Sequence, residues 1–189
     1  MASSFSTSLK LEKMTTGEKA GLWGTVTNTN LDLVEQAVGG YVELSLASGN
    51  QTPAISDGAA SDGRNKVIKL TGTLSANRSL IFPDSCEKTY LVIDGTTRSS
   101  SHYTITIKTS SGTGVTMPVG STMLVIVDGT NVITGITQKG YITTTSAYTA
   151  VNGDQVIVDT SAAAVTVTLP ASPAVGNEVH FLDGKLSFN

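Results

Sequence analysis

The chain has 189 residues, of which 39% are hydrophobic and 14% charged, whereas about a quarter of the residues of an average globular protein are charged. Its formal net charge of −3 excludes the strongly basic surface of a typical nucleic-acid-binding protein and argues against binding to anionic membranes. The longest uninterrupted apolar run, residues 123–127, is too short to insert into a membrane, and the first residues lack the apolar core of a secretory signal.

Residues 1–40 differ from the rest of the chain and are expected to form a separate N-terminal segment with one short helix, at about residues 30–38. Asn30 is a good N-cap for this helix, and two glycines at 39 and 40 would end it. Its apolar residues Leu31, Val34 and Val38 recur at helical spacing and predict one apolar stripe. Because so short a helix is marginal alone, the stripe should be buried against Trp23, the β body or copies of itself.

From residue 41 onward the sequence predicts only strands and turns. One phrase, a strand ending in proline followed by a strand ending in Asp-Gly, occurs three times, in residues 80–95, 115–129 and 167–184. Since proline ends a strand and Asp-Gly favours a tight turn, each copy is interpreted as a β-hairpin. The strand at 103–109 is expected to point Ile105 and Ile107 inward, with threonines and Lys108 outward.

These patterns predict a mostly β chain built of two or more small antiparallel sandwich or hairpin units. The first β domain is expected over residues 41–134, and a linker with a second β unit over 135–189. The last Asp-Gly pair should lead into another strand, but only five residues follow it. Because an unpaired strand leaves open hydrogen-bonding groups, the native polypeptide is expected to continue past Asn189.

Residues that could carry catalysis are sparse. The aspartates that precede glycine are explained by turn chemistry, and they are Asp57, Asp62, Asp94, Asp128 and Asp183. His102 and His180 fall on different β units, and the single cysteine, Cys86, has no partner sulfur. Neither a nucleophile elbow nor a phosphate-binding loop occurs. We expect no enzymatic activity and no catalytic, cofactor or metal site.

One spaced motif near the N-terminus resembles a known family. It reads Gly17-x-x-x-Gly21-x-Trp23-Gly24-x-x-x-Asn28-x-Asn30-x-x-x-x-Glu35 and is similar to the N-terminal segment of tail fibre proteins of tailed bacteriophages, especially marine ones. Phrases in residues 62–74, 108–115 and 159–173 also resemble that family. The resemblance extends over nearly the whole chain, and the order of the motifs strengthens it.

The resemblance implies a homotrimeric fibre that is a structural part of the virion tail, made in the host cytoplasm. Its N-terminal segment would attach to the tail or to an adaptor protein, and its distal part would adsorb to a host surface glycan or protein. The residues predicted as attachment or trimer contacts are Trp23, Asn28, Asn30, Leu31 and Val34. Core packing within one subunit is an equally open role for Trp23.

The sequence is also compatible with two other functions. A carbohydrate-binding or adhesin module would need an exposed aromatic platform or a loop site. A polysaccharide-degrading tailspike would need a cluster of carboxylates on a longer solenoid, and it is the less favoured alternative. The sequence does not separate a tail fibre from a head fibre or a baseplate component.

Overall fold

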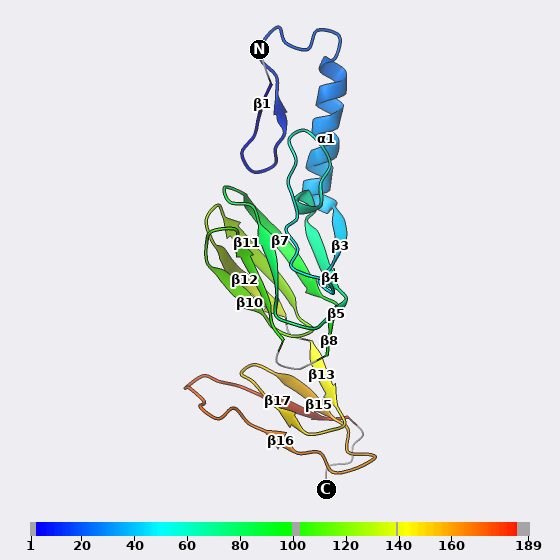
Figure 1. Ribbon diagram of the computed structural model, residues 1–189, viewed down its shortest axis with the longest axis vertical. Helices are drawn as coiled ribbons and strands as arrows, with labels where there is room; N and C mark the ends of the chain where they lie inside the picture. Colours follow the sequence, from blue (N-terminus) through cyan, green and yellow to red (C-terminus); the bar gives the residue numbers. More distant parts are fainter. Residues whose placement is uncertain (1–2, 100–102, 139, 185–189) are drawn as a thin grey trace. The chain divides into compact units, whose positions relative to one another are not determined.

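The computed structural model describes residues 3–99, 103–138 and 140–184, and it is mostly β with one α-helix near the N-terminus (Figure 1). The elements in chain order are β1 (Ser4–Phe5), β2 (Glu12–Lys13), α1 (Trp23–Gly39), β3 (Tyr41–Ser45), the 3-10 helix η1 (Asp62–Arg64), β4 (Val67–Thr71), β5 (Thr73–Leu74), β6 (Arg78–Phe82), β7 (Glu87–Asp94), β8 (Thr97–Arg98), β9 (Ile105–Thr109), β10 (Gly114–Met117), β11 (Thr122–Asp128), β12 (Val132–Gln138), β13 (Tyr141–Thr144), β14 (Tyr148–Thr149), β15 (Gln155–Val158), β16 (Val167–Thr168) and β17 (His180–Asp183). They form two compact units, residues 1–137 and 138–189.

The strands of the first unit wind as a β-solenoid, and the expected antiparallel sandwich is wrong. The coil β4–β5–β6 is followed by the coil β7–β8–β9, and each strand of the second coil pairs in parallel with its counterpart in the first. Thr73, for example, pairs with Thr97, 24 positions later, and Arg78 pairs with Ile105, 27 positions later. The β3 strand lies parallel to β4 in the same way. The pairing partner is therefore one full coil away rather than across a short turn.

The three repeated phrases are corners of the solenoid and not hairpins. In each copy the two strands belong to different sheets: β6 and β7, β10 and β11, and β16 and β17. The prolines do end the first strand, but the chain then crosses to another sheet. One Asp-Gly pair does close a tight turn, between β11 and β12. There Gly129 has φ +92°, and Asp128 Oδ1 accepts hydrogen bonds from the backbone N–H groups of Thr130 and Asn131.

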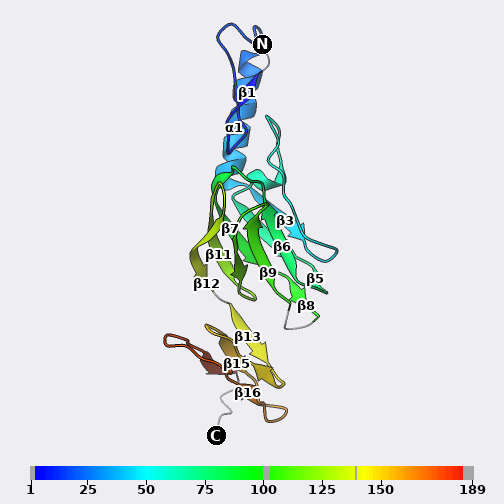
Figure 2. The same ribbon diagram turned by 60° about the vertical axis from the view of Figure 1, so that its left-hand side comes forward.

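The core of the first unit lies between a five-stranded sheet of order β12-β11-β7-β4-β3 and a three-stranded sheet of order β10-β9-β6 (Figure 2). Strand alternation fills it from both sides, and the predicted inward residues Ile105 and Ile107 are fully buried. Tyr90 stacks on Phe82 with ring centroids 4.2 Å apart, and its hydroxyl donates to the Gly63 carbonyl over 2.7 Å. Desolvation raises the pKa of Tyr90, so this ring remains a hydrogen-bond donor.

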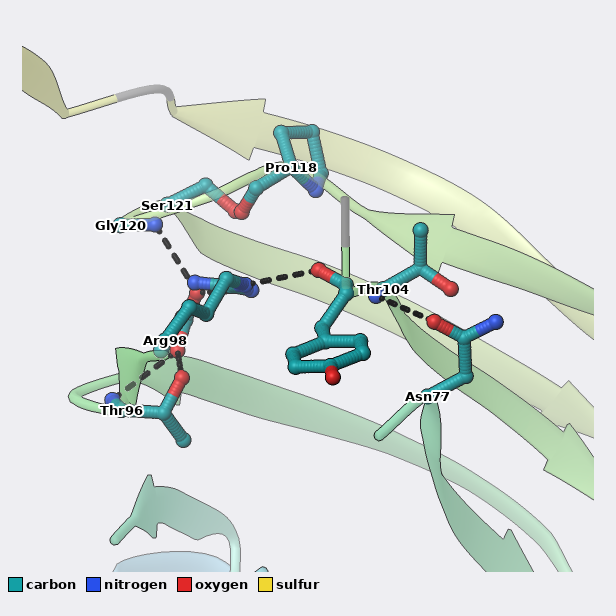
Figure 3. A network of polar contacts seen from close by, with 9 residues as sticks. Asn77, Thr96, Arg98, Thr104, Pro118, Gly120 and Ser121 are labelled. Carbon is teal, nitrogen blue, oxygen red and sulfur yellow. Dashed lines mark hydrogen bonds and ion pairs between the residues drawn. The ribbon is translucent and has the colours of Figure 1, made fainter. Parts of the chain in front are cut away.

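A buried polar network fixes the corner between β7 and β8 (Figure 3). Asp94 Oδ2 pairs with Arg98 Nη2 at 2.9 Å and also accepts from the Gly120 backbone N–H at 2.9 Å. Its Oδ1 accepts from the backbone N–H and the hydroxyl of Thr96. Arg98 Nε donates to the Tyr103 carbonyl over 3.0 Å. One carboxylate thus holds together the end of β7, the start of β8 and the turn before β11.

The helix is longer than predicted and buries a different face. It begins at Trp23, with Leu22 at the N-cap position, and not near Asn30. Its buried residues are Val26, Leu33 and Ala37, whereas the predicted stripe of Leu31, Val34 and Val38 is exposed. Asn30 is not an N-cap. Its side-chain amide makes two hydrogen bonds to the backbone of β2, because Oδ1 accepts from the Glu12 N–H and Nδ2 donates to the Glu12 carbonyl. This contact directs the Asn30 face of α1 toward the β1–β2 hairpin.

The second unit is also built from parallel pairs. The strands β13, β15 and β17 form one parallel sheet, and β14 pairs in parallel with β16. Buried Asp154 supports the turn before β15, because its Oδ2 accepts from the Tyr148 hydroxyl at 2.9 Å and from the Val151 N–H at 2.8 Å. Burial, together with Asp154, raises the pKa of Tyr148 to about 12.

The Tyr148–Asp154 hydrogen bond predicts a pH dependence. Because the pKa of Tyr148 is higher in the folded than in the unfolded chain, its stabilisation is complete below pH 10 and is lost as the pH rises through about 12. The ring is half-buried, so solvent screening limits this loss to about 1 kcal/mol. Calorimetry of the full chain and of Tyr148→Phe should show a stability difference that disappears between pH 10 and 12. A difference that stays constant over this range would contradict the assignment.

Candidate assembly surface

The helix α1 carries an exposed apolar face, which we call the α1 seam and define as Trp23, Thr27, Leu31, Val34 and Val38. Trp23 is 66% exposed, Leu31 62% and Val38 72%, while Val34 is 37% exposed and Thr27 half-buried. From Thr27 to Val38 the spacing is 4-3-4, the spacing of core positions in a coiled coil. Large apolar side chains gathered on one exposed face are typical of an interaction surface.

The side of α1 that adjoins the seam is held in place, so the direction of the seam is fixed. Val26, Leu33 and Ala37 are buried, and Asn30 is bound to the backbone of β2. Gln36 Oε1 accepts hydrogen bonds from the Ser61 N–H at 3.4 Å and from Arg64 Nη1 at 3.5 Å. The helix therefore cannot rotate its seam toward the body without breaking these contacts.

Arg64 is the centre of this anchorage. Its side chain is fully buried, and its guanidinium donates to Leu9 O at 3.0 Å, to Ser56 O at 2.7 Å and to Ala59 O. Further bonds reach Ser61 Oγ and Gln36 Oε1. All five acceptors are neutral oxygens, and desolvation lowers the pKa of Arg64 from its ordinary value. One cation thus ties together the N-terminal loop, α1 and the loop before η1.

A second polar cluster joins the loop before α1 to the β1–β2 hairpin. Lys19 Nζ lies 2.9 Å from Glu12 Oε1, and the Ser3 hydroxyl donates to both Glu12 and Glu18. The hydrogen bond from Lys19 lowers the pKa of Glu12 and raises that of Lys19 itself. In Figures 1 and 2 the hairpin lies alongside α1. These contacts bind the hairpin to the loop that leads into the first turn of α1, where Trp23 lies.

The five residues predicted as attachment or trimer contacts do not all lie on one face of α1. Trp23, Leu31 and Val34 lie on the seam, whereas Asn28 is exposed on another side of the helix and Asn30 faces the hairpin. Trp23 does not pack in the core of this subunit, because two thirds of its surface is exposed. The sequence reasoning missed Thr27 and Arg64. Extending the 3-4 spacing back from Leu31 would have found Thr27, but no local signal marks Arg64.

Groups that could carry chemistry are dispersed. Within residues 3–99, 103–138 and 140–184, no three or more His, Cys, Asp or Glu residues lie close enough to hold a metal ion. His180 lies 3.4 Å from Glu178 on the surface, and His102 lies outside the described residues. Cys86 is buried, and desolvation raises its pKa. No helix in the described part of the chain has the length and apolarity needed to cross a membrane.

Three comparisons with known proteins were made. Nothing matched: neither a family model, nor a curated protein, nor a solved structure.

Proposed function

We propose that this chain is a structural component of a bacteriophage virion, a tail fibre that assembles as a homotrimer through the α1 seam. The observation that carries the proposal is an apolar helix face with coiled-coil spacing that the subunit holds outward. Identical copies placed around one axis would cover this face with the same face of their neighbours. The parallel solenoid of the body suits a stalk, because coils can be stacked along one direction.

The residue types on the seam favour three strands over two. With Leu31 and Val38 at the first core position of the heptad, Thr27 and Val34 occupy the second. Two-stranded parallel coiled coils prefer leucine at the second position, whereas β-branched residues there shift the preference toward trimers or higher oligomers. Thr27 and Val34 are both β-branched, and this favours three or more strands over two.

The N-terminal region is the part we propose to attach to the tail or to an adaptor protein. Trp23 is exposed in the first turn of α1, and Asn30 of the same helix is bound to the β1–β2 hairpin. An exposed tryptophan on a fixed scaffold is typical of an interface anchor. The distal part of the fibre would then contact a glycan or protein of the host surface.

Two measurements test this proposal: the oligomeric state of the chain in solution and its presence in purified phage particles. Light scattering of the full chain should give three protomers, and Val34→Lys should shift it to the monomer because a charge cannot be buried in the seam. Asn28→Lys, with the same charge change on another side of the same helix, should remain trimeric. Quantitative mass spectrometry of purified particles should detect the wild type and Asn28→Lys but little Val34→Lys.

The contrary outcomes are distinct. A wild-type chain that stays monomeric at micromolar concentration would remove the trimer. A trimer that is absent from purified particles would remove the virion role. Specific binding of glycans by a monomer would favour the carbohydrate-binding alternative, and turnover of a polysaccharide would favour the tailspike.

A further inference from the structure

The two sheets of the first unit differ in the chemistry of their outer faces. Pairing across the five-stranded sheet places Tyr41, Val67, Leu91 and Leu124 in one row. The row alternates with the inward residues Val42, Ile68, Val92 and Met123, so it points away from the core. Every member of the outward row is exposed or half-buried. The middle of this outer face is therefore a band of large apolar side chains.

Neighbouring positions extend the band. The next outward row contains Glu43, Lys69, Ile93 and Thr122. Its two charges neutralise each other, because Lys69 Nζ lies 3.0 Å from Glu43 Oε1. On the other side of the band, Ile126 is 37% exposed, and Ile133 of β12 is 48% exposed. The face thus has an apolar centre without an unpaired charge.

The outer face of the three-stranded sheet is polar. Its pairing places Ser79, Thr106 and Thr116 in one outward row. The other outward row contains Ile81, Lys108 and Gly114. Both sheets cover the same core, so general sheet-forming propensity does not account for the apolar outer face of the larger one. The contrast points to a surface that is covered in the assembled protein.

We propose that the outer face of the five-stranded sheet packs against other copies of this chain, which continues the α1 seam into the β body. This inference rests on the proposed homotrimer. The two surfaces are continuous along the chain, because α1 ends at Gly39 and β3 begins at Tyr41. Tyr41, the first residue of β3, is 53% exposed and comes three residues after Val38 of the seam.

A second copy fits this face better than a glycan or an unrelated charged partner. Sugar-binding surfaces present aromatic platforms and polar groups that are free to bond, whereas this band has one aromatic residue, Tyr41, whose hydroxyl already donates to Glu43 over 2.6 Å. The Glu43–Lys69 pair leaves no net charge in the two central rows that could attract an ionic partner. A face whose centre is apolar and whose acidic residues, Glu87 and Asp128, lie at one end resembles the apolar core and polar rim of interfaces between identical subunits.

The test places a lysine on each of the two outer faces. Leu124→Lys lies in the apolar band, and Thr106→Lys lies at a half-buried outward position of the polar sheet. Light scattering over a dilution series should show that Leu124→Lys raises the dissociation constant of the oligomer at least tenfold, while Thr106→Lys leaves it unchanged. Ile126→Lys, at a more exposed place on the same face, should act like Leu124→Lys. Circular dichroism and the urea midpoint check that each variant is folded.

The outcomes separate this inference from the proposed function. If Val34→Lys dissociates the oligomer but folded Leu124→Lys and Ile126→Lys behave like the wild type, the sheet-face interface is overturned and the helical trimer stands. If the two face variants dissociate it but Val34→Lys does not, the sheet face carries the assembly and the seam is wrong. If the wild type is monomeric at every concentration, both proposals fail.

Discussion

Replacing Asp94 with alanine should lower the free energy of unfolding by roughly 3–5 kcal/mol, because it leaves the guanidinium of Arg98 buried without its partner. The side chains of Arg98 and Asp94 are 6% and 0% exposed. The substitution also leaves the backbone N–H groups of Thr96 and Gly120 without their acceptor. Urea denaturation of the full chain, followed by circular dichroism, measures the loss.

Asp128 provides the matched control for this substitution. It also precedes a glycine and accepts two backbone N–H groups, but it lies in an exposed turn and has no arginine partner. Asp128→Ala should therefore change the stability much less than Asp94→Ala. The double variant Asp94→Ala/Arg98→Met should regain part of the loss, since no charge is then left buried. Equal effects of Asp94→Ala and Asp128→Ala would show that the corner network contributes no special stability.

Replacing Arg64 with methionine should have an effect of similar size, roughly 3–5 kcal/mol, since three backbone carbonyls lose the donor that this fully buried side chain supplies. The chain around Arg64 should also loosen locally. Gly58 N–H donates to Lys10 O over 2.8 Å, and this bond joins two of the segments that Arg64 holds. Hydrogen exchange at Gly58 should therefore become faster than exchange at the core amides of β7.

Arg78 is the control for the Arg64 substitution. Its guanidinium also donates to backbone carbonyls, at Leu46 and Ala47, but Arg78 is only half-buried whereas Arg64 is fully buried. Arg78→Met should have a clearly smaller effect on the urea midpoint and no effect on exchange at Gly58. If Arg64→Met unfolds at the wild-type urea concentration, the anchorage of α1 must depend on the apolar contacts of Val26, Leu33 and Ala37 instead.

The sequence was sufficient to predict the β-rich class and the inward residues of individual strands. Ile105 and Ile107 alternate with polar residues in the sequence and are buried in the structure. The pairing partner was not predictable in this way, because alternation gives the same pattern in parallel and antiparallel strands. The repeated proline and Asp-Gly positions were consistent with hairpins as well as with corners, and only long-range pairing distinguishes the two.

Long-range contacts also explain the remaining differences between prediction and structure. Asp94 precedes a glycine and reads as a turn residue, yet its partners include Gly120, 26 positions away. Asn30 resembles an N-cap, but the backbone of Glu12 takes its amide and the helix continues toward Trp23. Leu31, Val34 and Val38 do form one apolar stripe on α1, as the spacing predicts. The stripe is exposed, however, and the helix is buried through another face that contains Leu33.

The spacing of the parallel pairs has an evolutionary consequence. Successive coils in the first unit are 24 to 27 positions apart and bond only to the coils beside them. Duplication of one such stretch in the gene would add a coil and extend the first unit by about 4.8 Å along the direction in which its strands pair. The size of the first unit could therefore change one coil at a time, without changes to the sequence before or after the added coil.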